Sequence, residues 1–143
     1  MSPDQIFQLV NTIALLSWII LLLFPFKEWS KKLLLGIIIS GFALLYGFLA
    51  FTHFSVDTFE SFGELSQLAQ LNADPMNVVI GWIHYLAFDL LAGLYITKNA
   101  EELGLNRYLL IPCQLFTFIM GPLGVLLYLI LRFAYTKKWL HAV

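Results

Sequence analysis

The sequence is poor in charged residues and in cysteine. Only 12% of its 143 residues are Asp, Glu, Lys or Arg, 60% are hydrophobic, and the mean hydropathy is +0.83. Soluble domains contain about 25% charged residues, so this composition excludes an ordinary soluble protein and is typical of an integral membrane protein. The single cysteine, Cys113, excludes an intrachain disulfide.

Several functional signatures are also missing. The sequence has no nucleophile elbow, no P-loop and no dinucleotide-binding glycine pattern, so it indicates no common soluble enzyme and no nucleotide cofactor. Its basic residues occur in small groups, which argues against nucleic acid as a partner. His53, His84 and Asp89 lack the spacing of a metal site, and three histidines are too few for a membrane di-iron enzyme. We therefore expect neither a cofactor nor a metal.

Long apolar runs dominate the chain. Four of them approach the roughly 20 residues that a helix needs to cross a bilayer, at about residues 5–25, 33–53, 75–97 and 107–133. Backbone polar groups in lipid must be satisfied within the chain, so all four are predicted to be helices. The N-terminus is acidic where a signal peptide is basic, so the first run is interpreted as a retained span. The predicted fold is an all-α integral membrane protein, with residues 1–143 forming one four-transmembrane-helix bundle.

Local signals support two of the predicted helix starts. Ser2 and Gln5 have the spacing of a capping box, and Asp74 with Pro75 suits a helix N-cap and first position. Residues 55–72 are too polar to cross a membrane, and they predict a short amphipathic interfacial helix between the second and third spans.

The fourth run and the charge pattern conflict in part. Pro112 and Pro122 predict a bent or interrupted helix. The first and third connectors contain lysine and arginine whereas the second has none, which places the first and third on the cytoplasmic side. Basic residues in 132–138 then fall on the opposite side if the fourth run crosses fully. Either the charge rule is violated or one segment is re-entrant; we predict four spans.

The third run carries two polar residues at membrane depth. His84 and Asp89 interrupt the apolar segment GWIHYLAFDLLAGLY. An ionised carboxylate there costs roughly 2.5 to 3.5 kcal/mol on insertion scales, so Asp89 needs a partner, a proton or a watery cavity. Tyr85 precedes Asp89 by four residues and shares its helix face. We predict His84, Tyr85 and Asp89 as catalytic residues.

The helical spacing separates the two titratable residues. Five residues correspond to about 140° around a helix axis, so His84 and Asp89 do not point at one small site without help from rotamers or a bulge. Asp89 is therefore expected to meet another group, from Tyr85, His53, Gln114 or Thr117. For His84, a structural hydrogen bond across the bundle remains an alternative.

Aromatic residues make up 16% of the chain. They are suited to lining a slot for a flat polyene or quinone, although for any single aromatic residue core packing or interfacial anchoring is the more common role. The predicted substrate-binding residues are Tyr46, Trp82, Phe88 and Gln114. The lipid bilayer and a hydrophobic isoprenoid or carotenoid are the expected partners. Small residues on the second span also permit a homo-oligomer.

Two segments resemble a known family. GWIHYLAFDLLAGLY and the later RYLLIPCQLFTFIMGPLGVLLYLILR are similar to small membrane proteins named after plant abscisic-acid-deficient 4, also called neoxanthin synthase. The resemblance covers residues 77–132 and depends on the W-I-H-x-L-x-x-D-L and G-P-x-G elements. It places His84 and Asp89 at the matching polar positions, and it places Gly121, Pro122 and Gly124 where the fourth run is interrupted.

The resemblance implies a carotenoid isomerisation. The plant family is linked to converting the di-epoxide violaxanthin into the allene neoxanthin, which needs one proton delivered to oxygen and another removed from the polyene. Without a plastid transit peptide, the chain resembles a bacterial member, expected as a multi-pass protein of the inner membrane. A non-catalytic lipid- or carotenoid-binding accessory protein is the alternative, and a proton or ion pathway is a third reading.

Overall fold

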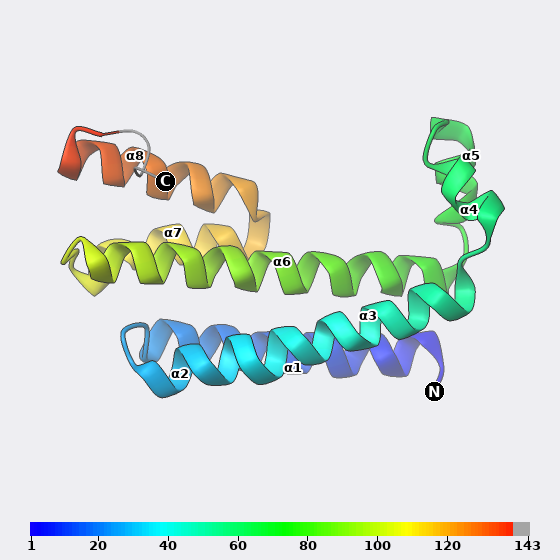
Figure 1. Ribbon diagram of the computed structural model, residues 1–143, viewed down its shortest axis with the longest axis horizontal. Helices are drawn as coiled ribbons and strands as arrows, with labels where there is room; N and C mark the ends of the chain where they lie inside the picture. Colours follow the sequence, from blue (N-terminus) through cyan, green and yellow to red (C-terminus); the bar gives the residue numbers. More distant parts are fainter. Residues whose placement is uncertain (139–143) are drawn as a thin grey trace.

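The computed structural model describes residues 1–138, and every element in that range is helical. In chain order the elements are α1 (Pro3–Leu23), α2 (Glu28–Leu33), the π-helical segment η1 (Leu34–Ile39), α3 (Ser40–His53), α4 (Val56–Ser61), α5 (Leu65–Leu71), α6 (Pro75–Glu102), α7 (Arg107–Met120) and α8 (Pro122–Thr136). α2, η1 and α3 follow one another without a break and form a single rod (Figure 1).

Both predicted helix starts are confirmed. The Ser2 hydroxyl accepts a hydrogen bond from the Gln5 backbone N–H at 3.3 Å, and Gln5 Oε1 accepts from the Ser2 N–H at 3.0 Å. Asp74 Oδ1 accepts from the backbone N–H of Met76 at 2.8 Å. Each cap satisfies backbone donors that have no partner within the helix.

Within residues 1–138, three helices are long and apolar enough to cross a membrane: α1, the rod Glu28–His53 and α6. They lie side by side, and α6 contacts both of the others (Figure 1). Buried side chains from all three meet in the core, with Val10 on α1, Phe42 on α3 and Ile83 on α6. The first three predicted spans are thus confirmed as apolar helices, and the all-α fold class with them.

The predicted fourth span is not confirmed. Residues 107–136 contain two helices of 14 and 15 residues, separated at Gly121, where φ is +28°. At 1.5 Å per residue each reaches only about 21 to 23 Å, short of a bilayer core of about 30 Å. α8 turns back along α7, as Figure 1 shows. Gly121 adopts a backbone conformation that residues with side chains avoid, and Pro122 starts the next helix.

The returning direction of α8 is established by its partners on α6. Gly121, at the start of α8, lies against Asp89 in the middle of α6. Tyr128, farther along α8, donates a hydrogen bond of 2.7 Å to Asn99 Oδ1 near the end of α6. The α7–α8 hairpin therefore begins and ends at the same end of the bundle.

The segment between α3 and α6 also differs from its prediction. In place of one amphipathic helix it contains the two short helices α4 and α5, which project away from the bundle (Figure 1). We call residues 54–72 the arm. The ring of Phe54, the residue directly after α3, contacts the rings of Phe59 and Phe62 at centroid distances of 6.2 and 6.5 Å, and this packing holds α4 against the start of the arm.

Candidate functional site

Asp89 lies at the middle of α6 and faces the tip of the α7–α8 hairpin. Its side chain is partly buried. A Cβ placed on Gly121 would overlap the Asp89 carboxylate, so this side chain lies directly against the glycine backbone. The absence of a side chain at Gly121 is what allows the hairpin tip to approach the carboxylate.

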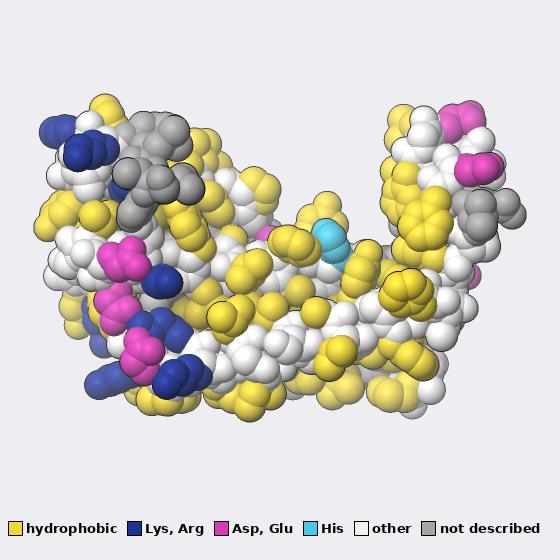
Figure 2. Space-filling view, in the orientation of Figure 1, with side chains coloured by type: hydrophobic (Ala, Val, Ile, Leu, Met, Phe, Trp, Pro, Cys, Tyr) yellow, Lys and Arg dark blue, Asp and Glu magenta, His cyan; other side chains and the backbone are white. Residues whose placement is uncertain are grey.

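Two clefts meet at this position. The arm-side cleft has a volume of about 580 Å³ and lies among α3, the arm and α6. The α1-side cleft, about 730 Å³, lies among α1, α6 and the end of α7. Tyr85, Asp89 and Pro122 line both clefts. Figure 2 shows a hollow with a largely hydrophobic floor between the arm and the hairpin.

The arm-side cleft brings several predicted residues together. His84, Tyr85, Phe88 and Asp89 from α6 line it together with Tyr46 from α3. The His84 ring lies between two aromatic rings, with centroid distances of 4.6 Å to Phe88 and 5.5 Å to Tyr46. His84 itself is exposed. The cleft therefore presents an accessible imidazole and a carboxylate on a wall of aromatic carbon.

Trp82 lines the other cleft. Its indole N–H donates a hydrogen bond of 2.7 Å to Asn11 Oδ1 on α1, and its ring lies 5.7 Å from that of Phe7. The predicted substrate-binding aromatics are thus divided between the two sides of Asp89.

Gln114 lies outside both clefts. Its side chain is buried and donates a hydrogen bond of 2.7 Å to Thr97 Oγ1, which in turn donates to the carbonyl of Gly93 at 2.8 Å. The side-chain amide is occupied in holding α7 against α6 and contacts neither cleft.

None of the expected side-chain partners reaches Asp89. Within residues 1–138 the carboxylate has no hydrogen bond. The Nδ1 atom of His53 lies within hydrogen-bonding distance of the Leu49 carbonyl oxygen and the Thr52 hydroxyl. The Thr117 hydroxyl donates a hydrogen bond to the Cys113 carbonyl. The group that Asp89 meets on a neighbouring helix is instead the backbone at Gly121.

Part of the lining of both clefts comes from residues outside the predicted set. Asn11, which lines the α1-side cleft, is a polar residue inside an apolar span, and this exception to the hydropathy pattern marks it as a candidate site residue. The arm residues Phe62, Leu68 and Asn72 carried no such signal, because their place in the cleft depends on how the arm projects from α3. Among the described residues, no three His, Cys, Asp or Glu side chains are grouped as metal ligands.

These features define a class: an all-helical membrane protein with three long apolar helices and a partly buried carboxylate at the tip of a helical hairpin. Residues 5–128 match the model of the ABA DEFICIENT 4-like family, and the chain belongs to that family. The match extends the resemblance seen in residues 77–132 to the first two spans. No curated protein and no solved structure matches the chain.

Proposed function

We propose that this protein binds a carotenoid or another isoprenoid lipid in the two clefts and isomerises it by acid/base chemistry. The observation that carries the proposal is the position of Asp89. Its carboxylate has no hydrogen bond within the described chain and lies where both apolar clefts meet. A long apolar ligand in either cleft would contact it.

The clefts suit a flat conjugated ligand better than a compact polar one. Aromatic residues line both, with Tyr46, Tyr85 and Phe88 on the arm side and Trp82 and Phe118 on the α1 side. Aromatic faces pack well against extended π systems. Their volumes also fall within the range of about 300 to 1,000 Å³ that is typical of small-molecule sites.

The proposed reaction is an isomerisation of an epoxide to an allenic alcohol. The protonated Asp89 carboxyl donates its proton to the epoxide oxygen, and the adjacent C–O bond breaks. His84, on the same cleft wall, removes a proton from the neighbouring polyene carbon, and that electron pair forms the second double bond of the allene. No atom is gained or lost, so the step needs no oxidant, metal or nucleotide.

The same geometry serves a second candidate function. Aromatic walls bind a polyene without any proton transfer, so a carotenoid-binding accessory protein would use the clefts but not the titration of Asp89. The two functions therefore differ in their dependence on the carboxyl proton.

Turnover by purified variants separates the two functions. The protein is purified in mild detergent, incubated with an epoxy-carotenoid, and product formation is followed by chromatography. We expect Asp89→Asn and His84→Ala to reduce turnover by at least about 100-fold, the usual contribution of a general acid or base. Asp4→Asn and His53→Ala are the controls, because both residues are exposed and line neither cleft.

Three outcomes have defined meanings. Loss of turnover in both site variants, with retained carotenoid binding, supports the isomerase. Binding without turnover in the unaltered protein selects the accessory function. Absence of binding in the unaltered protein refutes both.

A further inference from the structure

The basic residues of this protein all lie at one end of the fold. The eight Lys and Arg residues fall in the first and third connectors or next to them, and at the end of α8, and residues 33–97 contain none. Because the hairpin returns α8 to the end at which α6 finishes, these positions come together. Figure 2 shows the dark blue side chains gathered at that end. We call it the basic end.

Two of these cations share a small hollow. Lys27 follows α1, and Arg107 begins α7, yet both line one cavity of about 330 Å³. Its other lining residues are apolar: Leu23, Phe24, Pro25 and Phe26. Phe26 packs against the buried cluster around Leu105 and Leu110, and this contact holds the first connector beside the start of α7.

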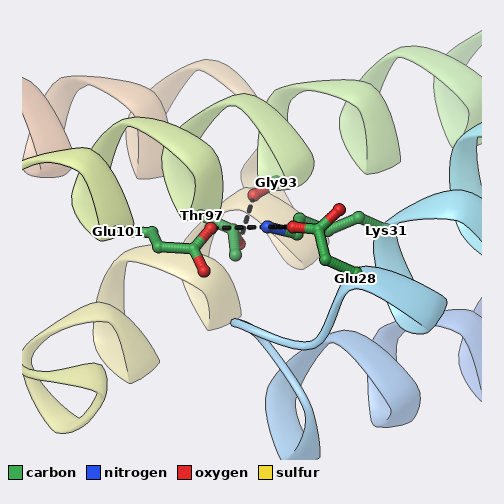
Figure 3. A network of polar contacts seen from close by, with 5 residues as sticks. All are labelled: Glu28, Lys31, Gly93, Thr97 and Glu101. Carbon is green, nitrogen blue, oxygen red and sulfur yellow. Dashed lines mark hydrogen bonds and ion pairs between the residues drawn. The ribbon is translucent and has the colours of Figure 1, made fainter.

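Within the described residues Lys27 and Arg107 have no acidic partner, while the Arg107 guanidinium lies over the Tyr108 ring, 5.2 Å from its centroid. No acidic residue in the described part of the chain lines the hollow. Lys31 is different: Figure 3 shows its ammonium group between Glu28 and Glu101, at 2.5 Å from each. The two cations of the hollow thus remain for an anion from outside the chain.

The hollow lies at the level of a membrane interface. Trp29 lies two residues after Lys27 in the sequence, and Tyr108 directly follows Arg107. Their side chains are 50% and 66% exposed. Exposed tryptophan and tyrosine at helix ends mark the headgroup region of a bilayer. Leu23 and Phe24 are also exposed, at 54% and 42%, so the apolar wall of the hollow is open to lipid.

We propose that the hollow between Lys27 and Arg107 binds the headgroup of an anionic phospholipid. The phosphate lies between the ammonium and guanidinium groups, and the glycerol and upper acyl carbons pack on the exposed Leu23 and Phe24. An acidic protein or a free phosphate would use the two cations but would gain nothing from this apolar wall. The site is separate from the clefts at Asp89 and does not depend on their function.

Lipid retention tests the proposal. The protein is reconstituted in nanodiscs of phosphatidylglycerol and phosphatidylcholine with the same acyl chains, in equal amounts, and is then released into mild detergent. Retained lipid is counted by native mass spectrometry. Because each cation at an anionic surface contributes a preference of about fivefold, the two together should retain phosphatidylglycerol about 25-fold over phosphatidylcholine.

Matched variants assign the preference to the hollow. The double variant Lys27→Gln with Arg107→Gln should lose most of it. The control, Lys32→Gln with Lys138→Gln, removes two exposed cations from the same end and should keep it, because neither residue lines the hollow. Both pairs change the net charge equally, and all four side chains are exposed, so folding should be retained.

Two results would overturn the proposal. One is an equal loss in the control pair, which would mean a diffuse effect of the basic end. The other is removal of the bound phosphatidylglycerol by millimolar inorganic phosphate in the unaltered protein, which would show a plain anion site without a contribution from the apolar wall.

Discussion

At the scale of single residues, two glycines decide what touches α6. Gly93 lies under the buried Trp18 of α1, and Gly121 lies against the carboxylate of Asp89. At both positions even a single Cβ atom would overlap the neighbouring side chain, that of Trp18 at Gly93 and that of Asp89 at Gly121. Other glycines, such as Gly81 on the same helix as Gly93, have open space where a Cβ would stand.

Substitution of Gly93 by alanine should destabilise the protein. The new Cβ would stand 2.7 Å from Trp18 Cη2 and 3.0 Å from Leu21 Cδ2, and overpacking of this kind costs typically about 1 to 3 kcal/mol. The midpoint of unfolding by a denaturing detergent, followed by circular dichroism, measures the effect. Gly81→Ala is the control and should be neutral or stabilising, because alanine is the better helix former. Equal stability of the two variants would show that α1 and α6 are not packed this closely.

Substitution of Gly121 by alanine should damage the site more than the fold. The methyl group would displace the Asp89 carboxylate from the place where the clefts meet, and we expect retention of a bound carotenoid to fall by about tenfold, equivalent to roughly 1.4 kcal/mol of binding. Absorption of the co-purified pigment per mole of protein measures this.

Gly104→Ala is the matched control for Gly121→Ala. Gly104 also has a positive φ, of 66°, but has nothing within 4 Å of its Cβ position. The Gly104→Ala substitution therefore also places alanine at a positive φ, but without contacting Asp89. A similar fall in pigment for both variants would contradict the proposed role of the hairpin tip.

At the scale of elements, the α7–α8 hairpin is held by backbone proximity and by buried hydrogen bonds. Gly124 of α8 lies so close to α7 that a Cβ would overlap the backbone N–H and hydroxyl of Thr117. Small residues allow such approach between helices in a membrane. Tyr128 and Gln114 then join the hairpin to α6 through Asn99 and Thr97.

Removal of the Tyr128 hydroxyl should loosen this hairpin. Tyr128 and Asn99 are both buried, so Tyr128→Phe leaves the Asn99 carbonyl oxygen without its donor, at a cost of about 1 to 3 kcal/mol of stability. Thermal unfolding in detergent measures the loss. Tyr135→Phe on the same helix is the control: that ring is 59% exposed, and its change should leave the unfolding temperature unaltered. Equal unfolding temperatures for the two variants would mean that the bond to Asn99 contributes little.

At the scale of the whole molecule, the hairpin resolves the conflict in the charge pattern. A fully crossing fourth helix would place the basic residues 132–138 opposite the first and third connectors. The observed hairpin places them at the same end, so a single orientation puts every Lys and Arg on one side of a membrane.

Side-specific labelling checks this arrangement. In a Cys113→Ala background, single cysteines at Lys32, Ser66 and Lys138 are treated in sealed vesicles with a membrane-impermeant maleimide. All three native side chains are exposed, so labelling reports the side and not burial. We expect positions 32 and 138 to react from one side and position 66 from the other. Joint labelling of 66 and 138 would instead establish four full crossings.

The candidate site was predictable only in part. His84, Tyr85, Phe88 and Asp89 stand out because polar and aromatic residues interrupt an apolar helix, and that helix does place them along one cleft. Gln114 stands out for the same reason, yet it bonds to Thr97 instead. Polarity at membrane depth shows that a residue needs a partner. It does not show which partner, since that depends on the face of α7 that packs against α6.

The class of the protein, its first three spans and the caps of the first and third spans follow from the amino-acid sequence alone, because hydropathy and capping are local properties of a few neighbouring residues. Contacts between distant segments establish that residues 107–133 fold back at Gly121, that Asp89 lies against a backbone and not a side chain, and that Lys27 and Arg107 share a hollow. A bent helix and a hairpin have the same hydropathy. Packing of α7 and α8 against α6 selects the hairpin.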